Sequence, residues 1–337
     1  MNQKYLLAAW VFLGLLALNV FPAAADTEMA VKFHRLMLAD GLSQSSIIST
    51  YQDSRGFIWM GTQDGLNRYD GQQIISYKPD PDDPHSLSDP NIWSIAEDAN
   101  GDLWIGTEGG GFNRFNRQLE NFTSYRYDPA QPASLEHYHV KTVAVDRHGD
   151  VWLGTIGDGL LRFHPATETI TPFTHDPGNP DSLPTDQVQS MLIDSRGLIW
   201  LGTEKGLTRF SPATGRMRHF THLPGEANAL IEGEVRAISE GRDGRLWVGT
   251  SRGLCRFDPI TEKFELHVVD PGHEAVPPAL SVSTVLEDPD GQVWVGSEHK
   301  GIFLLYPETG YCRAFSHNPQ DPASLSDNEV YGITMDR

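Results

Sequence analysis

The sequence predicts an all-β fold, a β-propeller built from four-stranded blades. A motif of Trp, an apolar residue, Gly and Thr or Ser occurs six times, beginning at Trp59, Trp104, Trp152, Trp200, Trp247 and Trp294. The spacing of 45 to 48 residues between successive motifs is typical of a repeat architecture. Short β-branched and aromatic runs alternate with Gly, Asp and Pro, and after residue 30 no segment keeps a helical period. Four strands per repeat of this length indicate a propeller blade.

The fourth repeat illustrates how each strand is predicted. An apolar run over residues 188–194 ends in Asp194 and is followed by a turn that contains Ser, Arg and Gly. The second strand is predicted over residues 198–203, the third over 207–210 and the fourth over 217–221. Glycine and proline in the intervening segments are the turn residues that separate neighbouring antiparallel strands.

The ends of the chain predict how the ring is built. Residues 33–38 match the outer strand of other repeats, so the N-terminal strand is expected to complete the final blade and remove an exposed edge. Six complete units run from Ile47 to Phe315, and a seventh starts at Val330 and stops after Asp336. The propeller is therefore expected to be seven-bladed when complete, with residues 33–337 forming a propeller domain truncated within blade seven.

Residues 1–25 are predicted to be a signal peptide, followed by a short linker over residues 26–32. Lys4 supplies the positive start, residues 5–21 are apolar, and residues 22–25 place small side chains where a signal peptidase cuts. An uncleaved membrane anchor is the alternative, because 17 apolar residues are close to the shortest span. Both interpretations predict export to the periplasm.

Composition limits the classes of partner. The formal net charge of −19 argues against nucleic acid and against anionic membrane surfaces, since both require basic patches. Cys255 and Cys312 occupy different positions of neighbouring repeats and are expected to be buried free thiols rather than a disulfide.

Several repeated residues resemble functional groups, but a structural role is favoured for each. The repeated Trp could stack on sugars, yet the same residue in every unit is what packing between blades requires. Asp98, Asn100 and Asp102 resemble the start of a calcium loop, but the twelfth position, where such a loop needs a carboxylate, is Gly109. The third-strand arginines are expected to form salt bridges with neighbouring turns. We predict no metal, no cofactor and no catalytic motif in this chain.

Positions whose residue differs from one repeat to the next predict a binding site. In each inner strand, the residues five and seven positions before the repeated Asp vary in chemistry from blade to blade. Inner strands line the axis of a propeller, so these side chains are expected to form an asymmetric polar pocket at the channel mouth. The alternative is that solvent tolerates any residue there. The predicted ligand-binding residues are Asn91, Trp93, His139, Lys141, Gln187, Gln189, Glu234, Arg236, Glu329 and Tyr331.

Residues 40–71 resemble the opening of the two-component regulator propeller family, from Asp40-Gly-Leu-Ser to Asn67-Arg-Tyr-Asp-Gly71. The resemblance extends over residues 33–337. It implies an extracytoplasmic sensor region, commonly of two seven-bladed propellers, followed by a β-sandwich, a transmembrane helix and a histidine kinase or diguanylate cyclase. The chain departs from the pattern at Gly241, which replaces the repeated Asp, and at residues 301–306, which lack the Arg.

The resemblance implies a periplasmic ligand-sensing region of a membrane-anchored signalling protein, a sensor histidine kinase being the leading expectation. The expected ligand is a small molecule, with carbohydrate favoured by analogy and by the acidic, aromatic rim. A homodimer is expected through the full-length protein, and membrane contact only through a segment outside the mature propeller. The alternatives are a diguanylate cyclase sensor, a scaffold for a protein partner, and a free lyase or glycosidase using Glu234, His139 and Glu329.

Overall fold

The computed structural model describes residues 31–126, 139–266 and 280–336. Residues 33–337 form one compact unit. The predicted signal peptide and most of the predicted linker lie outside the described residues. In the described part of the chain, no helix is both long and apolar enough to cross a membrane.

The described strands form six four-stranded antiparallel sheets, each with its strands paired in chain order. The first two blades are β1 (Ile47–Gln52), β2 (Ile58–Thr62), β3 (Gly65–Tyr69), β4 (Ile74–Tyr77), and β5 (Ile92–Glu97), β6 (Leu103–Thr107), β7 (Phe112–Asn116), β8 (Asn121–Tyr125). The next two are β9 (Val140–Val145), β10 (Val151–Thr155), β11 (Leu160–His164), β12 (Thr169–Phe173), and β13 (Val188–Ile193), β14 (Ile199–Thr203), β15 (Gly206–Ser211), β16 (Arg216–Phe220). The last two are β17 (Val235–Glu240), β18 (Leu246–Thr250), β19 (Gly253–Asp258), β20 (Lys263–Leu266), and β21 (Val282–Glu287), β22 (Val293–Ser297), β23 (Ile302–Tyr306), β24 (Tyr311–Phe315).

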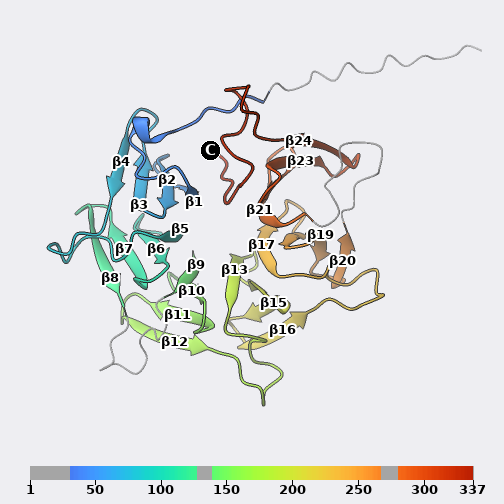
Figure 1. Ribbon diagram of the computed structural model, residues 1–337. Helices are drawn as coiled ribbons and strands as arrows, with labels where there is room; N and C mark the ends of the chain where they lie inside the picture. The colour runs from blue at the N-terminus through green and yellow to red at the C-terminus, as the bar shows by residue number, and fades with distance from the viewer. Residues whose placement is uncertain (1–30, 127–138, 267–279, 337) are drawn as a thin grey trace, which may run out of the picture. The chain divides into compact units, whose positions relative to one another are not determined.

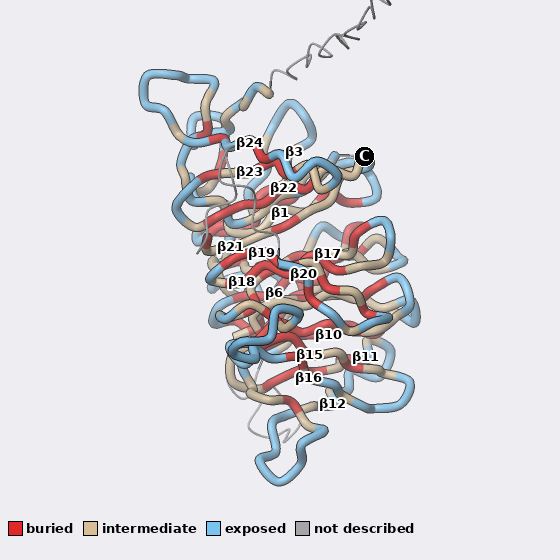
Figure 2. The backbone as a smooth tube through the Cα atoms, turned by 90° about the vertical axis from the view of Figure 1, so that its right-hand side faces the viewer, coloured by how far each residue is buried: buried red, intermediate tan, exposed pale blue. Residues whose placement is uncertain are grey.

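The six blades lie in a ring with the first strand of each blade towards its centre (Figure 1). Buried residues follow the strands and exposed residues gather in the loops (Figure 2). The all-β propeller is therefore confirmed, and in the fourth blade the observed strands agree with the expected ones to within about one residue at most ends.

Packing between blades uses the repeated aromatic residues. Trp59, Trp152 and Trp200 lie edge-to-face against a third-strand Phe of the following blade, with ring centroids 5.2 to 5.7 Å apart. Each of the three indoles also donates a hydrogen bond to the Asp six residues before it. The expectation that the Trp residues serve packing rather than sugar stacking agrees with this geometry.

The repeated Gly of the second strand permits this packing. A Cβ atom on Gly106 would lie 2.6 Å from the Val140 carbonyl oxygen and 2.7 Å from Ser94 Oγ. Because both atoms come from inner strands, only a glycine lets the two neighbouring inner strands approach the second strand this closely.

The third-strand arginines also have structural roles. Arg68, Arg114, Arg162, Arg209 and Arg256 each place the guanidinium 4.9 to 5.8 Å from the centroid of their own blade's Trp. The same arginines form ion pairs with Glu120, Asp102, Asp150, Glu262 and Asp243. These contacts confirm the expected salt bridges to turns. Cys255 and Cys312 are both buried and are not joined in a disulfide, and burial raises the pKa of Cys255 to about 11.

Two predicted strands at the ends of the chain are not strands in the structure. Residues 31–37 form no regular secondary structure and lead into a 3-10 turn, η1 (Leu38–Asp40), and residues 330–336 are not paired in a ladder. In this fold a strand pairs with the next strand of its own blade, and the described residues contain no second or third strand of a seventh blade. The positions still match a seventh blade. The ring of Phe33 lies 5.6 Å from that of Phe315, and Thr334 Oγ1 lies 2.7 Å from Thr50 Oγ1 on β1.

Candidate functional site

An axial cavity of about 460 Å³ lies where the inner strands converge. All seven residues five positions before the repeated Asp line it: Ile48, Trp93, Lys141, Gln189, Arg236, Ser283 and Tyr331. The seven side chains differ in size and charge, so the lining of this cavity is asymmetric although the blades around it are repeats.

A β-bulge explains why these positions face the axis. In all six inner strands the register with the second strand shifts at this residue, for example between Ile92 and Ser94 around Trp93. A bulged residue makes no ladder pair, and its side chain is turned away from the regular alternation of the strand. The bulge therefore presents one variable side chain per blade to the cavity.

Most of the predicted residues seven positions before the repeated Asp do not line the axial cavity. Of those predicted, Glu234 lines the axial cavity, but Asn91, His139, Gln187 and Glu329 do not. Residues two apart in a regular strand share a face, and this relation is broken because the residue five positions before the Asp is itself the bulged one. The main chain of the outer position is instead tied to the end of the second strand, as in the bond from Glu108 N to Asn91 O of 3.1 Å.

Four residues form a polar group that we call the Arg236 cluster: Arg236, Glu234, Ser281 and Glu298. Arg236 Nε lies 2.8 Å from Glu234 Oε2, and Arg236 Nη1 donates to Ser281 Oγ at 3.1 Å and to Glu298. Ser281 Oγ in turn donates to Glu298 Oε2 at 2.8 Å. One guanidinium therefore holds two carboxylates, Glu234 through Nε and Glu298 through Nη1.

Glu298 is a lining residue that the sequence analysis missed. It follows Ser297, the last residue of the Trp-x-Gly-Thr/Ser motif in the sixth blade. The corresponding residues of the other blades are Gln63, Glu108, Ile156, Glu204 and Ser251. This position varies as strongly as the bulge position, and that variation was the signal that could have identified it.

On the other side of the cavity, Lys141 and His139 lie against Trp93. The Lys141 ammonium is 4.3 Å from the Trp93 ring centroid, and the His139 ring is stacked 6.1 Å from it. Burial lowers the pKa of Lys141, against the opposing effect of the charges on Glu108 and Glu234. Among the described residues, no hydrogen-bond acceptor or carboxylate pairs with the Lys141 ammonium.

Tyr331 and Glu329 lie at a second hollow, of about 440 Å³, beside β1. The Tyr331 hydroxyl donates to Glu329 Oε2 at 2.8 Å, and this bond together with burial raises the pKa of Tyr331. Glu234, His139 and Glu329 were the candidates for an enzyme, and the structure gives each a different partner: Arg236, Trp93 and Tyr331. Glu234 and Glu329 also line different cavities.

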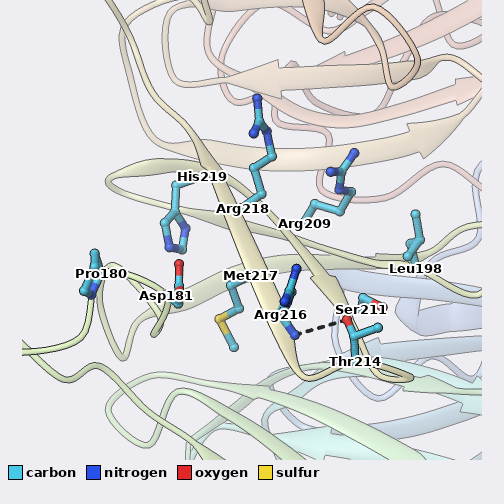
Figure 3. A pocket seen from close by; sticks show the side chains of 10 residues that line it. All are labelled: Pro180, Asp181, Leu198, Arg209, Ser211, Thr214, Arg216, Met217, Arg218 and His219. Atoms are coloured by element: carbon cyan, nitrogen blue, oxygen red, sulfur yellow. Dashed lines mark hydrogen bonds between the residues drawn. The ribbon is translucent and has the colours of Figure 1, made fainter.

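A larger hollow of about 720 Å³ lies at the outside of the fourth blade, where arginines of β15 and β16 line it (Figure 3). Arg209 and Arg218 both pair with Glu262, and Arg209 also covers Trp200. These side chains serve the packing of the blade, so we place the candidate site in the axial cavity. Among the described residues, no three His, Cys, Asp or Glu side chains could jointly hold a metal ion.

The fold and its axial cavity define a propeller, and comparison with known proteins shows which family its repeats match. Five segments match the two component regulator propeller model, at residues 41–64, 86–109, 182–205, 229–252 and 277–299. These five segments are similar to the repeats of that family, which confirms the resemblance seen in the sequence.

Solved structures are similar to the chain over most of its length. The extracellular domain of a protein assigned to a hybrid two-component system in B. thetaiotaomicron is 25% identical, with a TM-score of 0.75 over 91% of this chain and 39% of that one. A streptogramin B lyase is 16% identical, with a TM-score of 0.63 over 87% of this chain and 88% of the lyase. At that identity the lyase shows the fold alone.

A histidine kinase of Formosa agariphila, Histidine kinase P4, is 51% identical over 49 residues. That segment is 14% of this chain and 4% of the kinase. The chain thus spans about two fifths of the B. thetaiotaomicron domain and a small part of the kinase it matches.

Proposed function

We propose that residues 33–337 are the extracytoplasmic ligand-sensing region of a membrane-anchored signalling protein with a histidine kinase output. The family repeats, the similar extracellular domain and the segment shared with a histidine kinase support this proposal. The observation that carries the ligand site is the axial cavity, where seven bulged or equivalent positions place seven different side chains. A purely structural repeat has no need of such asymmetry.

The proposed ligand is a small carbohydrate. Trp93 offers an aromatic face, and Gln189, Ser283 and Glu234 offer hydrogen-bonding groups around the same cavity. The volume of about 460 Å³ falls within the ~300–1,000 Å³ of typical small-molecule sites. Binding would change the output by favouring one arrangement of a paired full-length protein, which requires different affinities for the two arrangements.

The test is the output of the full-length protein in membranes, measured with and without a panel of mono- and oligosaccharides. We expect one sugar class to change autophosphorylation, and Trp93→Ala to abolish the response. Lys205→Ala, an exposed residue outside the axial cavity, serves as the matched control. A response that is intact in Trp93→Ala would contradict the proposed site. Cyclic dinucleotide synthesis in place of autophosphorylation would favour the diguanylate cyclase alternative.

A further inference from the structure

The Lys141 side chain is the least compensated charge in the axial cavity. It extends from the bulge of β9 against Trp93 of β5, and its ammonium has no hydrogen-bond or ion-pair partner among the described residues. Removing an ammonium from water without a partner is costly, so such a group is retained at a cost to stability. The unpaired ammonium faces a cavity large enough to admit a ligand that could pair with it.

The described carboxylates around Lys141 form no ion pair with its ammonium. Glu234 and Glu298 are both bound to Arg236, and neither carboxylate forms an ion pair with Lys141. Glu108 at the end of β6 and Glu234 favour the charged ammonium, while Arg236 of β17 opposes it, and Trp93 and His139 complete its surroundings. The largest influence is burial, which lowers the pKa of Lys141 in spite of the two carboxylates.

We infer that the axial cavity takes an anionic sugar, whose single carboxylate or sulfate ester pairs with the Lys141 ammonium while its ring packs against Trp93. This inference rests on the proposed function and specifies the ligand class for the same site. An ion pair formed inside a partly buried cavity is stronger than one at the surface, because fewer water molecules screen it. The two carboxylates of the Arg236 cluster then provide acceptors for hydroxyl groups of the sugar.

The test compares sugars that differ only at C6. Glucose, glucuronate and glucose 6-sulfate, with the corresponding galactose series, are titrated calorimetrically into the chain. We expect an anionic member to bind at least about tenfold more tightly than its neutral parent, as a charge-assisted pair replaces a neutral contact. Comparing the carboxylate with the sulfate ester identifies the source of the charge.

Three variants test whether the charge of Lys141 causes the preference for the anionic sugar. Lys141→Met keeps the length of the side chain and is expected to abolish the preference for the anion, whereas Lys141→Arg keeps the charge and is expected to retain part of it. Lys205→Met removes an exposed lysine that does not line the axial cavity and should leave the preference unchanged. Thermal unfolding of each variant verifies that it is folded.

The outcomes distinguish the inference from the function on which it rests. Equal binding of acid and neutral sugars, both weakened by Trp93→Ala, would overturn the charge inference and leave the proposed ligand site intact. Preference for the anion that persists in Lys141→Met would also overturn it. Binding of no sugar in the panel overturns the inference, while a kinase response to another ligand would still support the proposed function.

A second measurement follows the proton that Lys141 takes up when an anionic ligand binds. Pairing with an anion raises the pKa of Lys141, so the affinity should be highest below the free-state pKa and fall as the pH rises towards the bound-state pKa. In calorimetry at alkaline pH, buffers of different ionisation enthalpy should then give different apparent binding enthalpies. In Lys141→Met this buffer dependence should disappear, a change that a merely structural role of Lys141 would not produce.

Discussion

Trp247 differs from the other repeat tryptophans in the source of its acceptor. Gly241 stands where the other five blades have Asp, and the Trp247 indole instead donates to Glu287 Oε2 of the next blade at 2.7 Å. A Cβ atom on Gly241 would lie 2.7 Å from the same oxygen, so glycine makes room for the carboxylate. The departure from the family pattern is therefore compensated by a neighbouring blade.

This compensation predicts that one substitution restores the stability that another removes. Glu287→Ala removes an acceptor of a buried indole and is expected to cost about 1–3 kcal/mol of unfolding free energy. Gly241→Asp alone should also destabilise the protein, because it places a carboxylate against Glu287. The double variant should recover most of the loss, because the introduced aspartate would then occupy the acceptor position used in the other blades. Urea unfolding measures all four proteins, and additive losses would contradict the exchange.

At the same scale, Lys141 predicts a dependence of stability on pH. Its pKa is lowered by burial from 10.5, so the unfolded chain binds this proton more tightly than the folded chain. The resulting cost is fully present below the folded-state pKa and is relieved as the pH rises from that value to 10.5.

Lys141→Met should therefore raise the melting temperature at neutral pH, by on the order of 1–2 °C, and the gain should vanish above the alkaline window. Melting curves at several pH values test this. A lower melting temperature for Lys141→Met at pH 7 would mean that the lysine stabilises the fold, in contradiction to the binding role proposed for it.

At the scale of elements, carboxylates at the ends of inner strands join one blade to the turn of the preceding blade. Glu97 at the end of β5 accepts hydrogen bonds from Ser54 N and Oγ at 2.7 and 2.6 Å. Between the first two blades the contact also includes Arg117, whose Nη2 lies 2.9 Å from Asp53 Oδ2 and 3.0 Å from Glu97 Oε1. All three charged side chains are buried.

Arg117→Met is expected to destabilise the protein by about 3–5 kcal/mol, because it leaves two buried carboxylates without their counter-ion. Arg252→Met removes a surface ion pair with Glu232 and should change stability by less than about 0.5 kcal/mol. Denaturant unfolding compares the two variants. Similar losses in both would show that the buried cluster contributes no more than a surface pair.

At the scale of the whole molecule, the two ends of the described propeller occupy the positions of a seventh blade. Phe33 packs on Phe315 in the way that outer-strand aromatics of adjacent blades pack on each other, as Phe220 does on Phe264. Arg35 donates to the main-chain oxygens of Ser324 and Leu325, and Thr334 bonds to β1. Contacts between residues 284 to 290 positions apart thus hold the two ends to the ring.

Phe33→Ala should loosen the ring locally. Loss of the aromatic pair costs roughly 0.5–1.5 kcal/mol beyond the buried area, so amide exchange should accelerate in β24 and in residues 318–325. β11 and β12, which lie in the third blade, serve as the internal reference. Exchange that is unchanged in β24, or accelerated equally in β11 and β12, would contradict a clasp made by the N-terminal segment.

The sequence by itself determined the architecture, because strand and turn preferences are local and the repeat states them six times. It also identified seven variable positions, and the structure places all seven around the cavity, six of them at bulges. Only the tertiary structure determined the features that depend on the register of the strands and on contacts between blades. The bulge at Trp93 turns its side chain into the cavity, Arg236 reaches Glu298 across 62 residues, and Glu287 replaces the missing aspartate of another blade. No periodicity encodes such features, since each depends on a local irregularity of the ladder or on packing between neighbouring blades.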